Sequence, residues 1–425
     1  MLKVSIAVLP RRAAALAQEY LTFARVVVLD GPRQSGKTTI LRSLAVTAGL
    51  PLKSFDDHRE LAAAVADPIG YLESISGPVA IDEYQRAGND FVLAIKLLVD
   101  RDPTPGRFLL AGSSNFLTTG QLHESLAGRI AIVPVRPLSR GEILERHEGF
   151  IKVALREPQA LTERSEPLSR LEFGELIAGG GFPDSVRATS KRARTVHFSA
   201  YAQTVISREA MGDAGSRRDP AILQRVFNVV TARTAQEFIL ESIAADAGVT
   251  TETASAHLAV LTTLHQVVLI PGWASTAASR AKRRPKIVSV DSGLAAFVLG
   301  HTAETIAEPR CHEFGQLVET YVVGELLRQA AWEDRCDVFH YRDRDQREVD
   351  LILTNGSTIV GIEVKASATV DRRWGDHLRY LGERVGSKWV GGIVLYAGEH
   401  AVSLGGGVRA VPISSLWIDR PGVSS

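Results

Sequence analysis

One motif limits the fold of this chain more than any other feature. Residues 31–38 read Gly-Pro-Arg-Gln-Ser-Gly-Lys-Thr, which fits the pattern Gly-x-x-x-x-Gly-Lys-Thr. The motif follows a short β-branched run at residues 25–30 and precedes a helical pattern at residues 39–45. A buried strand, a glycine-rich turn and a helix in this order are typical of a phosphate-binding loop. We therefore expect an α/β fold, with a parallel sheet between helices and phosphates at the carboxyl ends of its strands.

Each residue type in this loop has a chemical reason. Gly31 and Gly36 let the backbone curl so that its N–H groups face phosphate oxygens, and the helix that follows adds the positive end of its dipole. Lys37 is expected to reach the β- and γ-phosphates, and the Thr38 hydroxyl to ligate Mg²⁺. The residues expected to contact the nucleotide in this loop are Gly31, Pro32, Arg33, Gln34, Ser35, Gly36, Lys37, Thr38 and Thr39. ATP and Mg²⁺ are the ligands that the loop predicts.

A second segment supports the nucleotide site. Residues 78–85 begin with an apolar strand pattern that leads to Asp82 and Glu83. Asp82 is expected to hold Mg²⁺, and Glu83 to polarise the water that attacks the γ-phosphate, as a general base. Paired acids after a strand are also common in solvated loops. These acids therefore predict a catalytic site only because the chain also contains the phosphate-binding loop.

Two further positions are candidates for contacts with the γ-phosphate. The apolar run at residues 107–112 leads into polar residues, among which Ser114 is expected to sense the γ-phosphate. Arg129 is expected to stabilise the charge that develops during hydrolysis, in its own chain or across the subunit boundary of an oligomer. A solvated surface arginine is the alternative for Arg129.

The order of these motifs resembles a known family. Gly-Pro-Arg-Gln-x-Gly-Lys-Thr-Thr, Ile-Asp-Glu-x-Gln, Ala-Gly-Ser-Ser and Leu-Ala-Gly-Arg-(x)₇-Pro-Leu-Ser look like the AAA-14 type of AAA+/STAND-like P-loop ATPase. Gly-Gly-Phe-Pro at residues 180–183 is also typical of that group. Its members commonly carry a C-terminal domain of unknown function, DUF 4143, which resembles the PD-(D/E)xK nuclease fold. The resemblance covers nearly the whole chain and implies nucleotide binding, but its motifs do not specify what the ATPase works on.

The central part of the chain has the outline of a winged helix. Helical patterns are expected at residues 221–231, 239–247 and 252–265, and a strand at residues 267–270. Helix, glycine turn, helix and strand in this order are typical of that DNA-binding fold.

The expected wing is strongly basic. It covers residues 274–286, within a segment (186–290) that has twice as many Lys and Arg as Asp and Glu residues. The candidate DNA-binding residues are Arg280, Lys282, Arg283, Arg284 and Lys286. Such a cluster neutralises DNA phosphates without reading bases. The alternative is a structural lid, as in many STAND-like ATPases, whose basic run is a solvated loop.

The C-terminal third has a pattern of its own. A helix at residues 314–330 precedes expected strands at residues 337–341, 348–353 and 358–364, with an Asn-Gly hairpin turn between the last two. The Asp at position 350 and a Glu-x-Lys that follows it resemble the PD-(D/E)xK nuclease motif.

This motif predicts metal-dependent chemistry. Asp350 and Glu363 would converge on one or two Mg²⁺ ions, and Lys365, which shares a strand face with Glu363, would orient or deprotonate water. Glu319 on the preceding helix would complete the acid cluster, with Glu325 as the alternative. A strand that bears Glu-Val-Lys is also common on solvated surfaces. The Gln-x-x-x-Tyr helix of RecB-like nucleases is not evident after the lysine, which argues against cleavage.

Composition excludes several other classes. The chain has 425 residues, of which 45% are hydrophobic and 23% charged, as in folded soluble proteins. No stretch approaches the roughly 20 apolar residues of a membrane helix, and Arg11 and Arg12 follow the apolar N-terminus, the wrong order for a secretory signal. Two cysteines, Cys311 and Cys336, are too few for a disulfide scaffold or a zinc site. We expect a cytoplasmic protein with no membrane partner.

These patterns predict four parts and one leading function. The expected parts are an ATPase domain (1–145), a helical connector (146–218), a winged-helix-like domain (219–305) and a nuclease-like domain (306–425). The leading hypothesis is an ATP-driven protein that acts on DNA, with possible cleavage by the tail. The alternatives are a STAND-like signalling switch, or a DNA-binding regulator, associated with defence or a toxin–antitoxin pair, whose tail is inactive.

Overall fold

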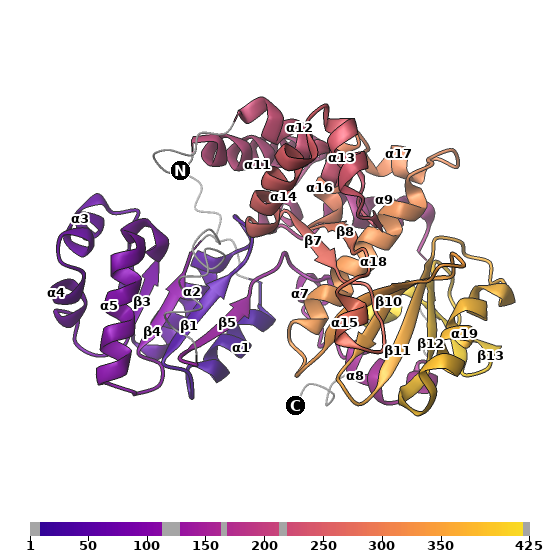
Figure 1. Ribbon diagram of the computed structural model, residues 1–425, viewed down its shortest axis with the longest axis horizontal. Coiled ribbons are helices and arrows are strands. Elements are labelled where there is room, and N and C mark those ends of the chain that lie inside the picture. Colours follow the sequence, from indigo (N-terminus) through magenta and orange to yellow (C-terminus); the bar gives the residue numbers. More distant parts are fainter. Residues whose placement is uncertain (1–8, 113–127, 163–167, 212–218, 420–425) are drawn as a thin grey trace. The chain divides into compact units, whose positions relative to one another are not determined.

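The protein divides into two compact units. The computed structural model describes residues 9–112, 128–162, 168–211 and 219–419. Contacts group residues 1–138 and 263–265 into the first unit and the rest of the chain into the second (Figure 1). Among the described residues, no helix has the length and apolar character needed to cross a bilayer.

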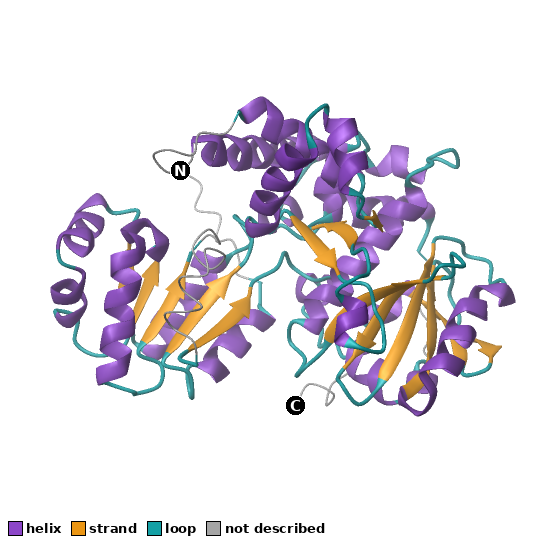
Figure 2. Ribbon diagram, viewed as in Figure 1, coloured by secondary structure: helices purple, strands orange, loops and turns teal. Residues whose placement is uncertain are grey.

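A parallel five-stranded sheet forms the centre of the first unit. Its strands are β1 (Val26–Asp30), β2 (Leu52–Ser54), β3 (Val79–Asp82), β4 (Phe108–Ala111) and β5 (Ile130–Pro134), in the order β2-β3-β4-β1-β5. The helices are α1 (Arg12–Tyr20), α2 (Lys37–Ala48), α3 (His58–Ala66), α4 (Pro68–Glu73) and α5 (Gly88–Arg101). Strand and helix alternate as the sequence predicted, and the strands lie between helices in the ribbon (Figure 2).

Alternation along β1 explains why both faces of this sheet are covered. Val26 and Val28 are buried in one core together with Phe91 of α5, whereas Val27 and Leu29 are buried in a second core. Ile40 of α2 belongs to the second core. A strand that is apolar at every position needs helices on both sides, and the parallel sheet supplies them.

The segment between the phosphate-binding unit and the central part of the chain is largely helical. Its helices are α7 (Arg140–Ile143), α8 (Phe150–Arg156), α9 (Arg170–Gly179), α10 (Pro183–Val186) and α11 (Lys191–Met211). Phe150 and Phe173 lie in the same hydrophobic core as Leu317 and Leu351 of the tail. The expected connector therefore shares a core with the C-terminal part of the chain.

The Gly-Gly-Phe-Pro motif forms a turn that a buried acid holds in place. Gly180 has a φ of +60°, and a side chain there would collide with Asp291 at 2.1 Å. The Asp291 carboxylate accepts a hydrogen bond of 2.6 Å from Gly181 N and also caps α16 (Ser292–Val298) through Gly293 N. The motif therefore has a packing role in the second unit.

The predicted helices and strands of the central part are present, together with a short strand, β6, that the sequence did not predict. They are α12 (Pro220–Ala232), β6 (Gln236–Glu237), α13 (Leu240–Ala247), α14 (Thr251–Thr263), β7 (Val267–Ile270) and β8 (Lys286–Ser289). The three strands form an antiparallel sheet in the order β6-β8-β7. Helix α14 ends before His265, whose φ of +54° is incompatible with a continuing helix. Two short helices, α15 (Ala277–Arg280) and α17 (Ala303–Ala307), complete this part.

The tail is a mixed six-stranded sheet with a helix on each face. Helix α18 (Phe314–Ala330) contributes to the core that contains Leu351, and α19 (Asp376–Val385) to the core that contains Ile352. The strands are β9 (Asp337–Arg342), β10 (Glu348–Thr354), β11 (Ile359–Lys365), β12 (Trp389–Tyr396), β13 (Val402–Gly405) and β14 (Val408–Pro412), in the order β13-β14-β12-β11-β10-β9. The predicted hairpin joins β10 to β11, with Gly356 at a φ of +89°.

Candidate functional site

The phosphate-binding loop lies where β1 ends and α2 begins. Gly36 is the N-cap of α2 with a φ of +98°, and Gln34 has a φ of +58°. A side chain at Gly31 would lie 2.1 Å from the carbonyl oxygen of Val135, so only glycine fits there. Left-handed residues next to a helix N-terminus form a concave backbone that suits anions. The local conformation is therefore the one that the sequence predicted.

Lys37 is buried in this loop, and no carboxylate of the described residues lies at hydrogen-bond distance from it. Its Nζ donates to the carbonyl oxygens of Gly31 at 2.8 Å and Pro32 at 2.7 Å. Burial lowers the pKa of Lys37 to about 8, although acids nearby, Asp30 first, oppose the shift. An ammonium that is paired only with neutral carbonyls is suited to exchange them for phosphate oxygens.

The two residues expected to hold Mg²⁺ are in contact with each other. Asp82 is the last residue of β3, and its carboxylate forms a hydrogen bond with the Thr38 side chain. Burial raises the pKa of Asp82 above its ordinary value, while the hydrogen bond from Thr38 opposes the shift. A carboxylate and a hydroxyl beside a phosphate-binding loop are the donors that Mg²⁺ prefers, so these residues fit the ion.

Glu83 is held by a residue to which the sequence analysis gave no role. Glu83 has a φ of +52°, and Gln85 Nε2 donates a 2.6 Å hydrogen bond to its Oε2. Gln85 in turn packs against Gly112, where a side chain would lie 2.1 Å from Gln85 Oε1. The Ile-Asp-Glu-x-Gln motif contained this signal, because the glutamine lies two residues beyond the acid.

Arg11 is a second residue that the sequence analysis missed. Its guanidinium donates to Ser35 O at 2.7 Å and to Arg136 O at 2.6 Å. The side chain therefore ties the phosphate-binding loop to the segment after β5. No local pattern predicted this contact, because the two carbonyls are far from Arg11 in the sequence.

Arg129 does not lie at the phosphate site of its own chain. Its carbonyl oxygen accepts a hydrogen bond from Val26 N at the start of β1, whereas the phosphate-binding loop follows the end of β1. The Arg129 side chain forms an ion pair with Asp100. The prediction that Arg129 acts within its own chain is therefore wrong, and action across a subunit boundary stays a prediction. Ser114 lies outside the described residues.

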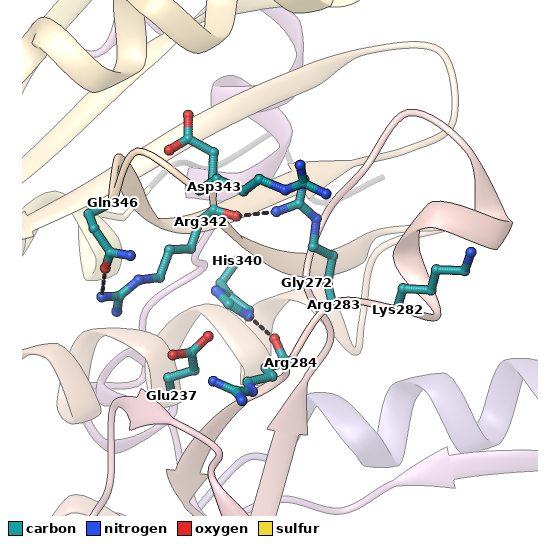
Figure 3. Close-up of a pocket in the computed structure, with 10 residues that line it drawn as sticks. Glu237, Gly272, Lys282, Arg283, Arg284, His340, Arg342, Asp343 and Gln346 are labelled. Atoms are coloured by element: carbon teal, nitrogen blue, oxygen red, sulfur yellow. Dashed lines mark hydrogen bonds between the residues drawn. The ribbon is translucent and has the colours of Figure 1, made fainter.

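Four of the five predicted DNA-binding cations lie at the surface of the second unit. Lys282, Arg283 and Arg284 are exposed, and Arg280 is half-buried, with its guanidinium 5.3 Å from the centre of the Phe339 ring. Arg283 donates a 2.6 Å hydrogen bond to the carbonyl oxygen of Arg342 (Figure 3).

A basic pocket lies between this segment and the β9–β10 hairpin. Five cations from the two segments line the pocket, and they are Lys282, Arg283, Arg284, Arg342 and Arg344. Two acids, Glu237 and Asp343, also line it (Figure 3). The excess of positive charge makes this pocket a candidate anion site.

Lys286, the fifth predicted DNA-binding residue, is buried. Only 2% of its surface is exposed, because it begins β8 and its side chain enters the interior of the unit. Its Nζ lies 2.7 Å from Glu319 Oε1, 2.9 Å from Glu348 Oε1 and 3.3 Å from Asp350 Oδ1. The prediction that Lys286 contacts DNA phosphates is therefore wrong.

The predicted acid cluster of the tail is assembled. Asp350 on β10 accepts a hydrogen bond of 2.8 Å from Val364 N on β11, and Lys365 Nζ lies 2.6 Å from Glu363 Oε1. Glu319 belongs to the same cluster, because Lys286 Nζ lies 2.7 Å from Glu319 Oε1 and 3.3 Å from Asp350 Oδ1. Burial, and then the Asp350 carboxylate, raises the pKa of both Glu319 and Glu363 above the ordinary value.

The alternative helix acid lies elsewhere. Glu325 forms an ion pair of 2.8 Å with Arg328 and accepts a hydrogen bond from Arg140 N, so it belongs to a separate buried network. The geometry therefore favours Glu319 as the helix acid near Asp350.

One further group of possible ligands was not expected from the sequence. The side chains of His301, Cys311 and Glu313 approach one another within 4.8 Å. His301 Nε2 and Glu313 Oε2 are 3.3 Å apart. Structural zinc sites use four protein ligands, so this trio is one short and we assign it no metal.

The parallel sheet, the phosphate-binding loop and the strand-end acids define an AAA-type P-loop ATPase domain. Residues 24–144 match the family described as "AAA domain", AAA_14. Residues 314–416 match a domain of unknown function, DUF4143, and residues 170–305 match another, DUF8612. The chain thus carries the AAA_14 and DUF4143 domains that its motifs indicated.

Similar proteins cover most of the chain. The uncharacterized protein Rv2008c of Mycobacterium tuberculosis is 29% identical over 418 residues, which are 97% of this chain and 86% of the relative. The protein Mb2031c of Mycobacterium bovis matches equally well. Among solved structures, the Walker-type ATPase PABY2304 of Pyrococcus abyssi is 16% identical, with a TM-score of 0.42 over 69% of this chain and 96% of that one. The RuvB Holliday junction branch migration motor of Thermotoga maritima is 18% identical, with a TM-score of 0.29 over 61% of this chain and 87% of that one.

Proposed function

We propose that this protein is a magnesium-dependent ATPase whose turnover is coupled to DNA binding. The observation that carries the proposal is the state of Lys37, which is buried in the phosphate-binding loop and, within the described ranges, donates to two backbone carbonyls and to no carboxylate. Asp82 and Thr38, in contact beside it, supply the donors that a nucleotide-bound Mg²⁺ requires.

The chain's own residues account for the steps of hydrolysis. The backbone N–H groups of the loop bind the phosphates, and the Lys37 ammonium leaves the Gly31 and Pro32 carbonyls to pair with the β- and γ-phosphates. Mg²⁺, when bound, neutralises phosphate charge and orients the γ-phosphate for in-line attack. Glu83 accepts a proton from the attacking water, and Gln85 holds the Glu83 carboxylate in position.

Binding of DNA is assigned to the basic pocket. Exposed Lys282, Arg283 and Arg284, together with two arginines of the β9–β10 hairpin, supply positive charge in one place. Contacts of this kind bind phosphates irrespective of sequence, so we expect binding that weakens steeply with salt.

Cleavage of DNA by the tail is not part of the proposed function. The predicted metal ligand Asp350 and the helix acid Glu319 both lie close to the ammonium of Lys286, a lysine outside the nuclease-like motif. These residues do not fit a divalent ion in the described conformation, because the positive charge that it would supply is already present. This observation favours an inactive nuclease-like tail, as in the DNA-binding regulator named among the alternatives.

The test is ATP turnover measured with and without duplex, single-stranded and branched DNA. We expect DNA to accelerate turnover by the wild type, and Glu83→Gln to retain ATP binding but lose hydrolysis. The Arg283→Ala/Arg284→Ala double variant is expected to lose the DNA stimulation and retain basal turnover. Arg310→Ala, which removes another exposed arginine of the second unit, is the matched control.

Anisotropy with labelled DNA at several salt concentrations completes the test. Removal of two phosphate contacts reduces the slope of log affinity against log salt by about two. A wild type that binds ATP but whose turnover no DNA form changes would contradict the coupling and support the signalling switch.

A further inference from the structure

Lys286 occupies the centre of the acidic cluster. Its Nζ lies within 3.3 Å of oxygens from Glu319 on α18 and from Glu348 and Asp350 on β10. The Lys286 side chain is 2% exposed, so these three carboxylates supply the opposite charge that a buried ammonium requires.

The two shorter distances, to Glu319 and Glu348, are those of charge-assisted hydrogen bonds. N–H···O contacts between an ammonium and a carboxylate are about 2.7–2.9 Å long, whereas Mg²⁺ lies about 2.0–2.1 Å from its oxygen ligands. An ammonium and a divalent ion cannot share the same oxygens of Glu319 and Asp350, because the two positive charges repel each other at short range. The cluster has room for one of them.

The charges of the cluster are nearly balanced by the chain itself. Its carboxylates are Glu319, Glu348, Asp350 and Glu363, and the cations paired with them are Lys286, Lys365 and Arg342. The three cations offset all but one of the four negative charges.

We propose that Lys286 takes the place of the divalent cation implied by the nuclease-like motif, so that the cluster is an ion-pair clamp that works without metal. The clamp fastens β8 to α18 and β10. This role is independent of the ATPase activity and of DNA binding at the basic pocket.

Other hydrogen bonds also join the central part of the second unit to the tail, and they support a fastening role. His340 N on β9 donates to Pro271 O at 3.0 Å, Trp273 N donates to His340 O at 2.6 Å, and His340 Nε2 lies 2.8 Å from Arg284 O. Gln316 Nε2 on α18 donates to the carbonyl oxygens of Ala232 and Thr234. The clamp thus lies in a continuous seam between the central part and the tail of the second unit.

The experiment measures Mn²⁺ uptake by the full chain without nucleotide, from the electron paramagnetic resonance signal of free Mn²⁺. Wild type and Asp350→Asn are expected to bind the same amount. Lys286→Met is expected to gain a Mn²⁺ site, and the double variant Lys286→Met/Asp350→Asn to lose it again. Lys282→Met removes an exposed lysine four residues away and is expected to behave as wild type. Any Mn²⁺ held by the phosphate-binding loop contributes equally to the wild type and to all four variants.

Three outcomes would overturn the clamp. One is Mn²⁺ uptake by the wild type that Asp350→Asn abolishes, and another is Mn²⁺-dependent DNA cutting with the same dependence on Asp350. The third is a folded Lys286→Met that gains no site. If Lys286→Met does not fold, the comparison of wild type with Asp350→Asn still decides the question, because neither variant alters the lysine.

Discussion

Both units bury a lysine beside acids, and the two lysines are held in opposite ways. Lys37 donates to two backbone carbonyls, and burial lowers its pKa to about 8. Lys286 is surrounded by three carboxylates that hold its pKa above the ordinary value. The comparison teaches that a buried lysine indicates a ligand site when its charge is unmet, and a structural contact when the chain itself supplies the opposite charge.

The largest expected effect is on catalysis at the first lysine. Lys37→Met removes the ammonium that would contact the β- and γ-phosphates, so we expect ATP hydrolysis to fall by about 10²–10³, the loss typical of a deleted transition-state donor. Steady-state phosphate release measures the effect. Arg42→Met, on the exposed side of the same helix, is the control, and equal losses in both variants would remove Lys37 from the mechanism.

For the free energy of unfolding, we expect the substitution of Lys286 to have a larger effect than the substitution of Lys37. Lys286→Met leaves buried carboxylates without their cation and is expected to cost about 3–5 kcal/mol. Lys37→Met removes a charge that burial disfavours, so a loss below about 1 kcal/mol is expected. Denaturant unfolding of the apo protein, followed by probes in each unit, gives both values. A similar loss of unfolding free energy in the two variants would contradict the contrast between the two lysines.

The lowered pKa of Lys37 predicts a pH dependence of nucleotide binding. Below pH 8 the free protein already carries the ammonium, so ATP affinity is expected to be flat. Above pH 8 the neutral amine must first take up a proton, so affinity is expected to fall by about tenfold for each pH unit. Calorimetry in buffers of different ionisation enthalpy should detect that proton. Proton release on binding in this range would contradict the assignment.

The smallest expected effect concerns the residue that positions Glu83. Gln85→Leu removes one hydrogen bond to the carboxylate, with a net value of about 1 kcal/mol, so a loss of about fivefold in turnover is expected. ATP affinity should stay unchanged, because the role assigned to Gln85 is to position the Glu83 carboxylate. Partial recovery by Gln85→Asn or by added acetamide would distinguish positioning from a folding defect.

Local pattern was sufficient to predict most of the fold. The apolar alternation of β1, the glycines of the loop and the Asn-Gly turn between β10 and β11 lie within short stretches, and each limits the backbone by its own sterics or burial. The same holds for the pair formed by Glu363 and Lys365, which are two residues apart on one strand. Local pattern could not predict the contacts of Arg11, because both carbonyls that it contacts are far from it in the sequence.

What the amino-acid sequence determined by itself is the phosphate-binding loop and the pair of strand-end acids, because the residues within each segment are neighbours and their conformations follow from glycine, burial and strand periodicity. Only the tertiary structure decided that Arg129 lies away from its own phosphate site and that Lys286 is internal. Both outcomes depend on distant segments brought together by a common core. The local sequence around Lys286 would suit an exposed lysine of the basic run as well as a lysine buried among carboxylates. Folding decides between the two, because it determines which acids surround the ammonium.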